Sequence, residues 1–155
     1  MDKKLVAYFS ASGVTEKKAK KLAEMAGADI YEIKPVHPYT ESDLNWMNKN
    51  SRSSKEMNDL SFRPEIADRV NDMDSYDEIY LGFPIWWNLA PTIVNTFIES
   101  YDLTGKKVTV FATSGGSDMR NAERNLQRQY SQIYWMKGQL LNNRKAIEAF
   151  LEHMR

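Results

Sequence analysis

The fold of this chain is decided near its start, by the stretch LVAYFSASGVT at residues 5–15. Residues 5–9 form an uninterrupted apolar run, as expected of a strand that is buried on both faces. From Thr15 onward the apolar residues recur at helical spacing. Between strand and helix lies a loop of small hydroxyl residues around one glycine. Such a loop presents unpaired N–H groups and the positive end of the helix dipole, so it predicts a phosphate site, with an ordinary turn as the alternative.

The predicted phosphate loop supplies donors of two kinds. Its hydroxyl groups can donate hydrogen bonds to an anion, and Gly13 permits positive φ and a close approach of the backbone. The residues assigned to this loop are Ser10, Ala11, Ser12, Gly13, Val14 and Thr15.

Composition limits the class of protein. A length of 155 residues predicts one domain, residues 1–155, with a substantial core, and 42% hydrophobic with 27% charged residues is typical of a globular protein. The 21 basic and 21 acidic residues give no net charge, so we expect no nucleic-acid partner. The absence of cysteine excludes disulfides, thiolate catalysis and cysteine metal sites. We further expect no metal, no membrane span, no signal segment and a cytoplasmic location.

Strand and helix patterns alternate along the chain, which predicts a parallel sheet covered by helices on both faces. Residues 29–33 are more polar and suit an edge strand. The predicted strands are 5–9, 29–33, 79–83, 108–112 and 133–136, and the predicted helices are 15–26, one with Pro91 in its first turn, one from about residue 118, and 143–154.

The segment from Tyr39 to Tyr76 is harder to assign. Thr40 and Asp43 have the spacing of a capping box. Beyond Ser51 polar residues dominate, and we expect a long excursion with little regular structure.

Three loops share one end of the predicted sheet, where open parallel sheets bind their ligands. The first is the phosphate loop. The second, Pro84-Ile85-Trp86-Trp87-Asn88, offers two tryptophans that can pack on a planar ring, and the third, Thr113-Ser114-Gly115-Gly116-Ser117, offers small donors for the polar edge of that ring. A ligand with a phosphate, a chain and a flat heterocycle fits all three loops, and flavin mononucleotide (FMN) has that shape.

Over nearly its whole length the sequence resembles the short-chain flavodoxins and flavodoxin-like proteins. The resemblance is carried by GFPIWW at residues 82–87, Pro91, Phe97-Ile98, GKKV at 105–108 and FATSGGS at 111–117, together with the loop at 10–15, Arg63-Pro64 and Tyr76-Asp77. It implies a flavodoxin-like three-layer α/β sandwich, with a five-stranded parallel sheet of order 2-1-3-4-5.

The resemblance also implies non-covalent FMN that carries the electrons, with no catalytic side chain. Residues 10–15 would hold the phosphate, Pro84 to Asn88 would line one side of the ring, and Thr113 to Ser117 would contact its pyrimidine edge. The family often has glycine where this chain has Asn88. Asparagine tolerates the left-handed conformation better than most residues, so a flexible peptide beside the flavin can persist at some energetic cost.

The leading function is therefore that of an electron carrier between redox proteins. This chain has no net charge, whereas such electron carriers are strongly acidic. The alternative is therefore an FMN-dependent reductase of quinones or similar small acceptors that uses NADH or NADPH. A non-redox binding module on the same fold is a third. We expect a monomer or weak homodimer.

Several residues can be interpreted either as packing residues or as functional residues. Trp86 or Trp87 can cap the core, whereas Trp46 and Trp135 are expected to be packing residues, with Trp46 a secondary candidate for the other face of the ring. The arginines at 120, 124 and 128 are expected to form an ordinary exposed face. The sharper hypothesis is that Arg120 attracts an anionic substrate or reductant.

Overall fold

The computed structural model describes residues 3–11, 13–45, 47–113, 119–141 and 144–153. Its centre is a parallel sheet of strands β1 (Lys4–Tyr8), β2 (Asp29–Glu32), β3 (Glu78–Pro84), β4 (Lys107–Thr113), β5 (Tyr134–Trp135) and β6 (Gln139–Leu140). The hydrogen-bonded order is β2-β1-β3-β4-β5, and β6 also pairs with β4. The predicted order is confirmed, and the polar strand β2 lies at an edge as expected.

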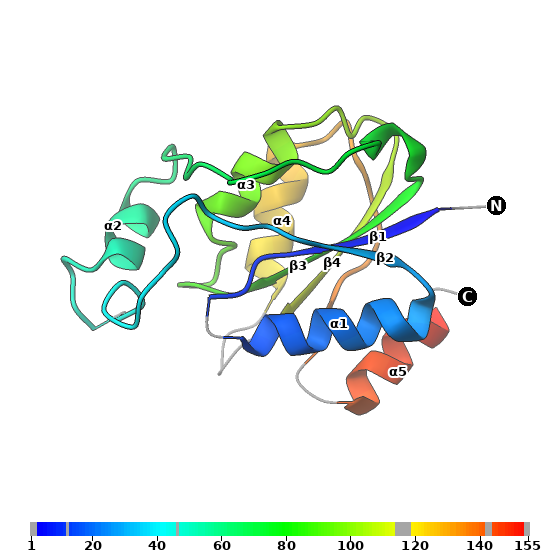
Figure 1. Ribbon diagram of the computed structural model, residues 1–155, viewed down its shortest axis with the longest axis horizontal. Coiled ribbons are helices and arrows are strands. Elements are labelled where there is room, and N and C mark those ends of the chain that lie inside the picture. Colours follow the sequence, from blue (N-terminus) through cyan, green and yellow to red (C-terminus); the bar gives the residue numbers. More distant parts are fainter. Residues whose placement is uncertain (1–2, 12, 46, 114–118, 142–143, 154–155) are drawn as a thin grey trace.

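Helices cover both faces of this sheet (Figure 1). One face packs against α1 (Val14–Ala26) and α5 (Arg144–His153), and the other against α3 (Thr92–Glu99) and α4 (Arg120–Gln129). Strand β1 contributes side chains to both cores. Leu5 and Ala7 point to the α3 and α4 side, while Val6 and Tyr8 point to the α1 and α5 side. Burial on both faces explains the continuous apolar run at the start of the chain.

The predicted helix ends agree with the structure to within one or two residues. Gly27 ends α1 in the left-handed conformation, and its N–H donates to the carbonyl of Ala23. Pro91 was expected in the first turn of α3 but is the residue just before it, with an extended ψ of 146°. Helix α4 begins at Arg120.

The fifth strand position differs from the prediction. Residues 133–136 were expected as one strand, but the chain pairs with β4 only over β5, leaves the sheet, and pairs again as β6. Gly138 lies in this interruption, where a Cβ would stand 2.5 Å from the carbonyl oxygen of Val110. Its N–H donates to Glu123 Oε2 at 2.6 Å. Gly138 therefore approaches β4 closely, but its N–H is taken by a side chain of α4 and not by the strand ladder.

Between β2 and β3 the chain forms a separate structure that we call the lobe, residues 37–64. Its base is closed by antiparallel backbone contacts: Val36 N–H donates to Glu65, and Ala67 N–H donates to Lys34. The lobe contains helix α2 (Arg52–Asn58), and a 3₁₀ turn, η1 (Met73–Ser75), follows before β3. In Figure 1 the lobe extends beyond the carboxyl end of β1, at the same end of the sheet where α1 begins.

The expectation of little regular structure after Ser51 was wrong at α2. Ser51 caps this helix, since its Oγ accepts from Ser54 N–H at 3.4 Å. One turn along, Arg52 Nε pairs with Glu56 Oε2 at 3.0 Å. The predicted capping box is confirmed by reciprocal bonds between Thr40 and Asp43, although the chain there completes only a single turn.

Candidate functional site

The phosphate loop leaves the sheet in the predicted way. Phe9 N–H still donates to Gly82 on β3 at 2.9 Å, after which the chain turns. Ser10 Oγ accepts from Gly13 N–H at 3.1 Å, and Gly13 adopts φ 93°, immediately before α1. The first N–H groups of α1 have no partner within the helix. Apart from Gly13 itself and the adjoining backbone, no described atom lies within 4 Å of the place where a Cβ on Gly13 would stand, so the loop has open space beside the helix start.

A buried hydroxyl pair connects the first loop to the third. Thr15 Oγ1 lies 2.8 Å from Thr113 Oγ1, and both residues are buried. Thr113 is the last residue of β4, and its carbonyl accepts from Ile85 N–H at 3.1 Å. Thr113 therefore joins all three predicted loops at the carboxyl end of the sheet.

The second loop is a tight reversal of the chain. Trp86 and Leu89 exchange both backbone hydrogen bonds, at 2.9 Å each. The two residues between them are left-handed, Trp87 with φ 49° and Asn88 with φ 65°, as a two-residue type I′ turn requires. Asparagine accepts this conformation readily, as expected for position 88, whereas a bulky tryptophan with positive φ is an outlier that the fold must hold in place.

The two tryptophans have different surroundings. Trp86 is half-buried and packs edge-to-face on Phe9 and Tyr39, with ring centroids 5.8 Å and 5.6 Å apart. The geometry therefore favours the structural interpretation of Trp86, in which its side chain caps the core. Trp87 has 44% of its surface exposed and lies in the loop at the carboxyl end of β3. Of the pair, Trp87 is the one available to a planar ring.

Several predicted residues lie outside the described part of the chain. These are Ser12 of the first loop, Ser114, Gly115, Gly116 and Ser117 of the third loop, and Trp46. Of the described site residues, Pro84, Ile85 and Asn88 lie in the second loop beside Trp87, and Ala11 and Val14 lie in the first. Asn88 is further tied to α4, because its carbonyl accepts from Asn121 Nδ2 at 3.2 Å.

The lobe contributes a wall that the sequence analysis did not assign. A cavity of about 680 Å³ lies between the lobe and the second loop. Its described lining residues are Met47, Lys49, Ser54, Met57, Asn58, Trp87 and Leu89. The only hint in the sequence was the suggestion that the excursion around Trp46 could fold over the site.

The lobe folds around Arg52. Its guanidinium lies 3.8 Å from the centre of the Tyr39 ring, and it donates to Glu56 and to the carbonyl of His37. Glu56 is only 5% exposed, and its carboxylate also accepts from Tyr39 Oη. Burial, followed by this hydrogen bond, raises the pKa of Tyr39 well above its ordinary value.

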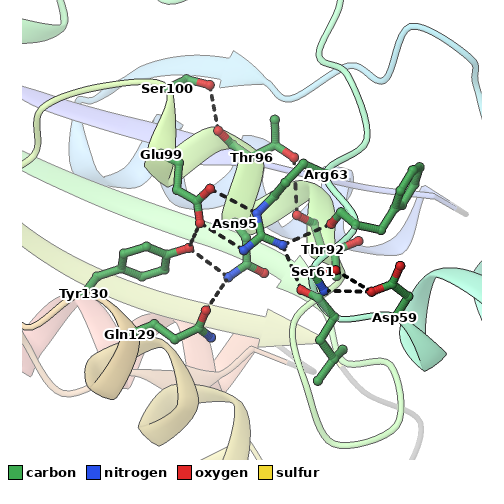
Figure 2. Close-up of polar contacts among 12 residues, drawn as sticks. Asp59, Ser61, Arg63, Thr92, Asn95, Thr96, Glu99, Ser100, Gln129 and Tyr130 are labelled. Atoms are coloured by element: carbon green, nitrogen blue, oxygen red, sulfur yellow. Dashed lines mark hydrogen bonds and ion pairs between the residues drawn. The ribbon is translucent and has the colours of Figure 1, made fainter.

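A second arginine fastens the lobe to the body of the protein, as Figure 2 shows. Arg63 Nε and Nη2 each donate to the carboxylate of Glu99 on α3, at 3.0 Å. Tyr130 donates to the same carboxylate, and Asn95 Nδ2 donates to Tyr130 Oη at 3.0 Å. The Arg63 bonds hold the pKa of Glu99 below its ordinary value, and burial is the main cause that raises the pKa of Tyr130 to about 12.

The remaining predictions concern residues away from the three loops. Trp135 is a packing residue, as expected, with Nε1 donating to the carbonyl of Tyr130 at 2.8 Å. The arginines at 120, 124 and 128 are exposed, in agreement with an ordinary helix face. Attraction of an anion by Arg120 stays a prediction.

Neither a metal site nor a membrane span appears in the described ranges. Within them, the acidic and histidine side chains form no cluster of three or more able to hold a metal ion. The helices described there lack the length and apolar character needed to cross a membrane.

The comparisons with known proteins agree with the doubly wound α/β fold. A sequence model of the flavodoxin family matches residues 3–154, so the chain belongs to the flavodoxin family. The crystal structure of a candidate flavoprotein from Bacteroides eggerthii is 50% identical, with 99% of this chain and 98% of that chain covered and a TM-score of 0.95. A search of curated proteins finds no match.

More distant solved structures share the fold. A flavoprotein from Lactobacillus acidophilus, solved in complex with FMN, is 20% identical over the full length of both chains, with a TM-score of 0.79. A flavodoxin from the domain Archaea is 16% identical over 95% of this chain and 90% of that one, with a TM-score of 0.55.

Proposed function

We propose that this protein binds FMN non-covalently at the carboxyl end of its sheet and transfers electrons through it. The observation that carries the proposal is the convergence on Thr113, which hydrogen-bonds Thr15 of the first loop and Ile85 of the second. Family membership and the Lactobacillus acidophilus flavoprotein solved with FMN support the choice of flavin.

In this proposal the chain's own residues bind and orient the cofactor. Residues 10–15 donate backbone and hydroxyl hydrogens to the phosphate at the start of α1. Trp87 presents a flat surface to the ring, and the third loop, of which the structure describes Thr113, is proposed to supply the contacts to its polar edge. FMN supplies the redox chemistry when bound, while the protein sets its orientation and its exposure to water.

The first test is an absorbance spectrum of the purified protein, followed by titration of the FMN-free protein with FMN. A yellow protein that binds one FMN per chain supports the proposal. A chain that takes up no FMN at any concentration tested overturns it.

A second function is favoured by the cavity beside Trp87. A carrier that serves only protein partners needs no cavity there, whereas a reductase of quinones or similar small acceptors can hold its substrate in one. Steady oxidation of NADH or NADPH by the purified holoprotein, with a quinone as acceptor, selects the reductase. Its absence, together with a stable one-electron-reduced state in a redox titration, selects the carrier. A cytoplasmic location belongs to the same proposal.

A further inference from the structure

A second cavity, of about 530 Å³, lies in the lobe on the opposite side of α2 from the cavity beside Trp87. Sites that hold small molecules usually have volumes of about 300–1,000 Å³. Helix α2 is a wall of both cavities, because Ser54 and Asn58 line the one beside Trp87 while Arg52 and Lys55 line the second. The described lining residues of the second cavity all belong to the lobe, so this cavity is separate from the three loops of the proposed flavin site.

Most of the charge in the second cavity is neutralised within the lobe. Arg52 Nε lies 3.0 Å from Glu56 Oε2, and Arg52 Nη1 lies 3.8 Å from Asp43 Oδ2. Two lining residues of opposite sign remain, Lys55 and Asp59, and neither makes an ion pair with a residue that the structure describes. The second cavity thus offers one unpaired cation and one unpaired anion.

The end of α2 explains why these two charges do not pair with each other. Lys55 and Asp59 are four positions apart, the spacing at which opposite charges pair along a helix. However, α2 ends at Asn58, and Asp59 has left the helical conformation, with φ −128° and ψ 88°. Its Oδ1 instead accepts from Ser61 Oγ at 2.6 Å and from Ser61 N–H at 3.2 Å. These bonds hold the carboxylate of Asp59 in place without neutralising its charge.

An exposed aromatic ring lines the second cavity together with these charges. Phe62 is 45% exposed, and its N–H donates to the carbonyl of Asp59 at 3.0 Å, so one turn of the chain positions both residues. Asn50 adds a side-chain amide to the lining. An aromatic ring of this kind packs well against an apolar side chain. A ligand with an ammonium group, a carboxylate and an apolar side chain therefore matches what the second cavity offers.

We propose that the second cavity binds a small zwitterion with an apolar side chain, of the class of α-amino acids and dipeptides. The carboxylate of the ligand pairs with Lys55, its ammonium group pairs with Asp59, and its side chain packs on Phe62. Charge-assisted hydrogen bonds at both ends favour the zwitterion over a ligand with a single charge. The site is separate from the proposed flavin site, so this inference does not rest on the proposed function.

The binding test titrates four probes into the purified, isotope-labelled protein at pH 7 and follows the chemical shifts of its backbone amides. L-phenylalanine and L-phenylalanyl-L-alanine carry both charges, 3-phenylpropanoate lacks the ammonium group, and phenethylamine lacks the carboxylate. We expect at least one of the two zwitterions to bind more tightly than both singly charged probes, with the largest shifts within residues 43–62. Absence of shifts in this range with both zwitterions would overturn the proposal.

Three variants assign the parts of the ligand to the residues of the cavity. Lys55→Gln is expected to weaken the zwitterion and 3-phenylpropanoate about fivefold, with no weakening of phenethylamine. Asp59→Asn, which keeps the oxygen that accepts from Ser61, is expected to weaken the zwitterion and phenethylamine about fivefold, with no weakening of 3-phenylpropanoate. Phe62→Ala is expected to weaken all bound probes about fivefold. A charge variant that weakens both singly charged probes equally would contradict the proposed orientation.

Matched controls come from the same chain. Lys49 is exposed and lines the cavity beside Trp87, and Asp74 is exposed in η1. Lys49→Gln and Asp74→Asn are expected to leave all affinities unchanged. If Lys49→Gln weakens the zwitterion as much as Lys55→Gln does, the effect is a general one of charge and the proposal is overturned.

FMN affinity separates the second cavity from the flavin site. Lys55→Gln and Asp59→Asn are expected to bind FMN as tightly as the parent protein does. Loss of FMN affinity in both variants would assign the second cavity to the flavin and overturn this inference. A parent protein that takes up no FMN defeats the proposed function instead, and the titration with the zwitterions still decides whether the second cavity is a site.

Discussion

The two walls of the candidate site are held in different ways. The sheet wall, made by the first and second loops and the end of β4, is fixed by backbone bonds and by the buried pair of Thr15 and Thr113. The lobe wall is fixed by side chains, among them the partly exposed pair of Arg63 and Glu99. The sheet wall cannot shift without breaking these bonds. The lobe wall can loosen while the sheet stays intact, so the two should respond differently to mutation and to pH.

The largest effect is expected where the two walls meet. Phe9 directly follows β1, is buried, and contacts both Tyr39 of the lobe and Trp86 of the second loop. Phe9→Ala should lower the free energy of unfolding by about 3–5 kcal/mol, measured by urea denaturation. Phe62→Ala is the control, because this lobe residue is 45% exposed and should cost under about 0.5 kcal/mol. Equal costs would show that Phe9 does not join the walls.

The next effect concerns the sheet wall alone. Thr15→Val leaves the hydroxyl of Thr113 buried without its partner, which should cost about 1–2 kcal/mol of unfolding free energy. It also breaks the link that holds the phosphate loop against the end of β4, so FMN affinity should fall about tenfold. Thr113→Val should cost a similar free energy, and the double variant should cost less than the sum of the two. Additive costs would contradict a direct bond between these residues.

A smaller effect is expected at the turn of the second loop. Asn88 has φ 65°, so Asn88→Ala should cost about 1 kcal/mol and Asn88→Gly should be neutral or stabilising. Thermal unfolding of both variants measures this difference. If alanine and glycine behave alike, the left-handed turn is not retained in solution.

The smallest effect belongs to the fastening of the lobe. Glu99 has its pKa lowered below 4.5, first by the hydrogen bonds from Arg63. A carboxyl group whose pKa is lowered in the folded protein stabilises the fold at pH values above its ordinary pKa. This stabilisation is lost as the pH falls through the lowered pKa. Because the pair is partly exposed, Glu99→Gln should cost under about 1 kcal/mol near pH 7.

The same variant should make the lobe more sensitive to limited proteolysis near pH 7. The difference in unfolding free energy between parent and variant should close as pH falls below the lowered pKa. A difference that stays constant from pH 7 to acid would argue against the ionised carboxylate as the fastening group.

Sequence patterns predicted the sheet wall because its determinants are local. The apolar run of β1, the loop after it and the small residues after β4 can each be recognised within a few positions. Strand order followed from the family resemblance, and the shared end of parallel strands then brought the loops together.

The lobe wall was missed because its determinants are distant in sequence. Arg63 and Glu99 are 36 positions apart, and nothing local marks them as partners. Likewise, the edge-to-face contacts of Trp86 depend on Tyr39, which approaches only once the lobe has folded. The break in the fifth strand coincides with the bond from Gly138 N–H to Glu123 on α4, 15 positions away in the sequence.

The central claim is that the three loops joined at Thr113 bind FMN, and its most direct test is an FMN titration of the FMN-free protein and its Thr15→Val variant. Quenching of flavin fluorescence reports the bound fraction. We predict saturation at one FMN per chain for the parent protein and about tenfold weaker binding for the variant. No quenching by the parent protein, or equal affinity in the two proteins, would contradict it.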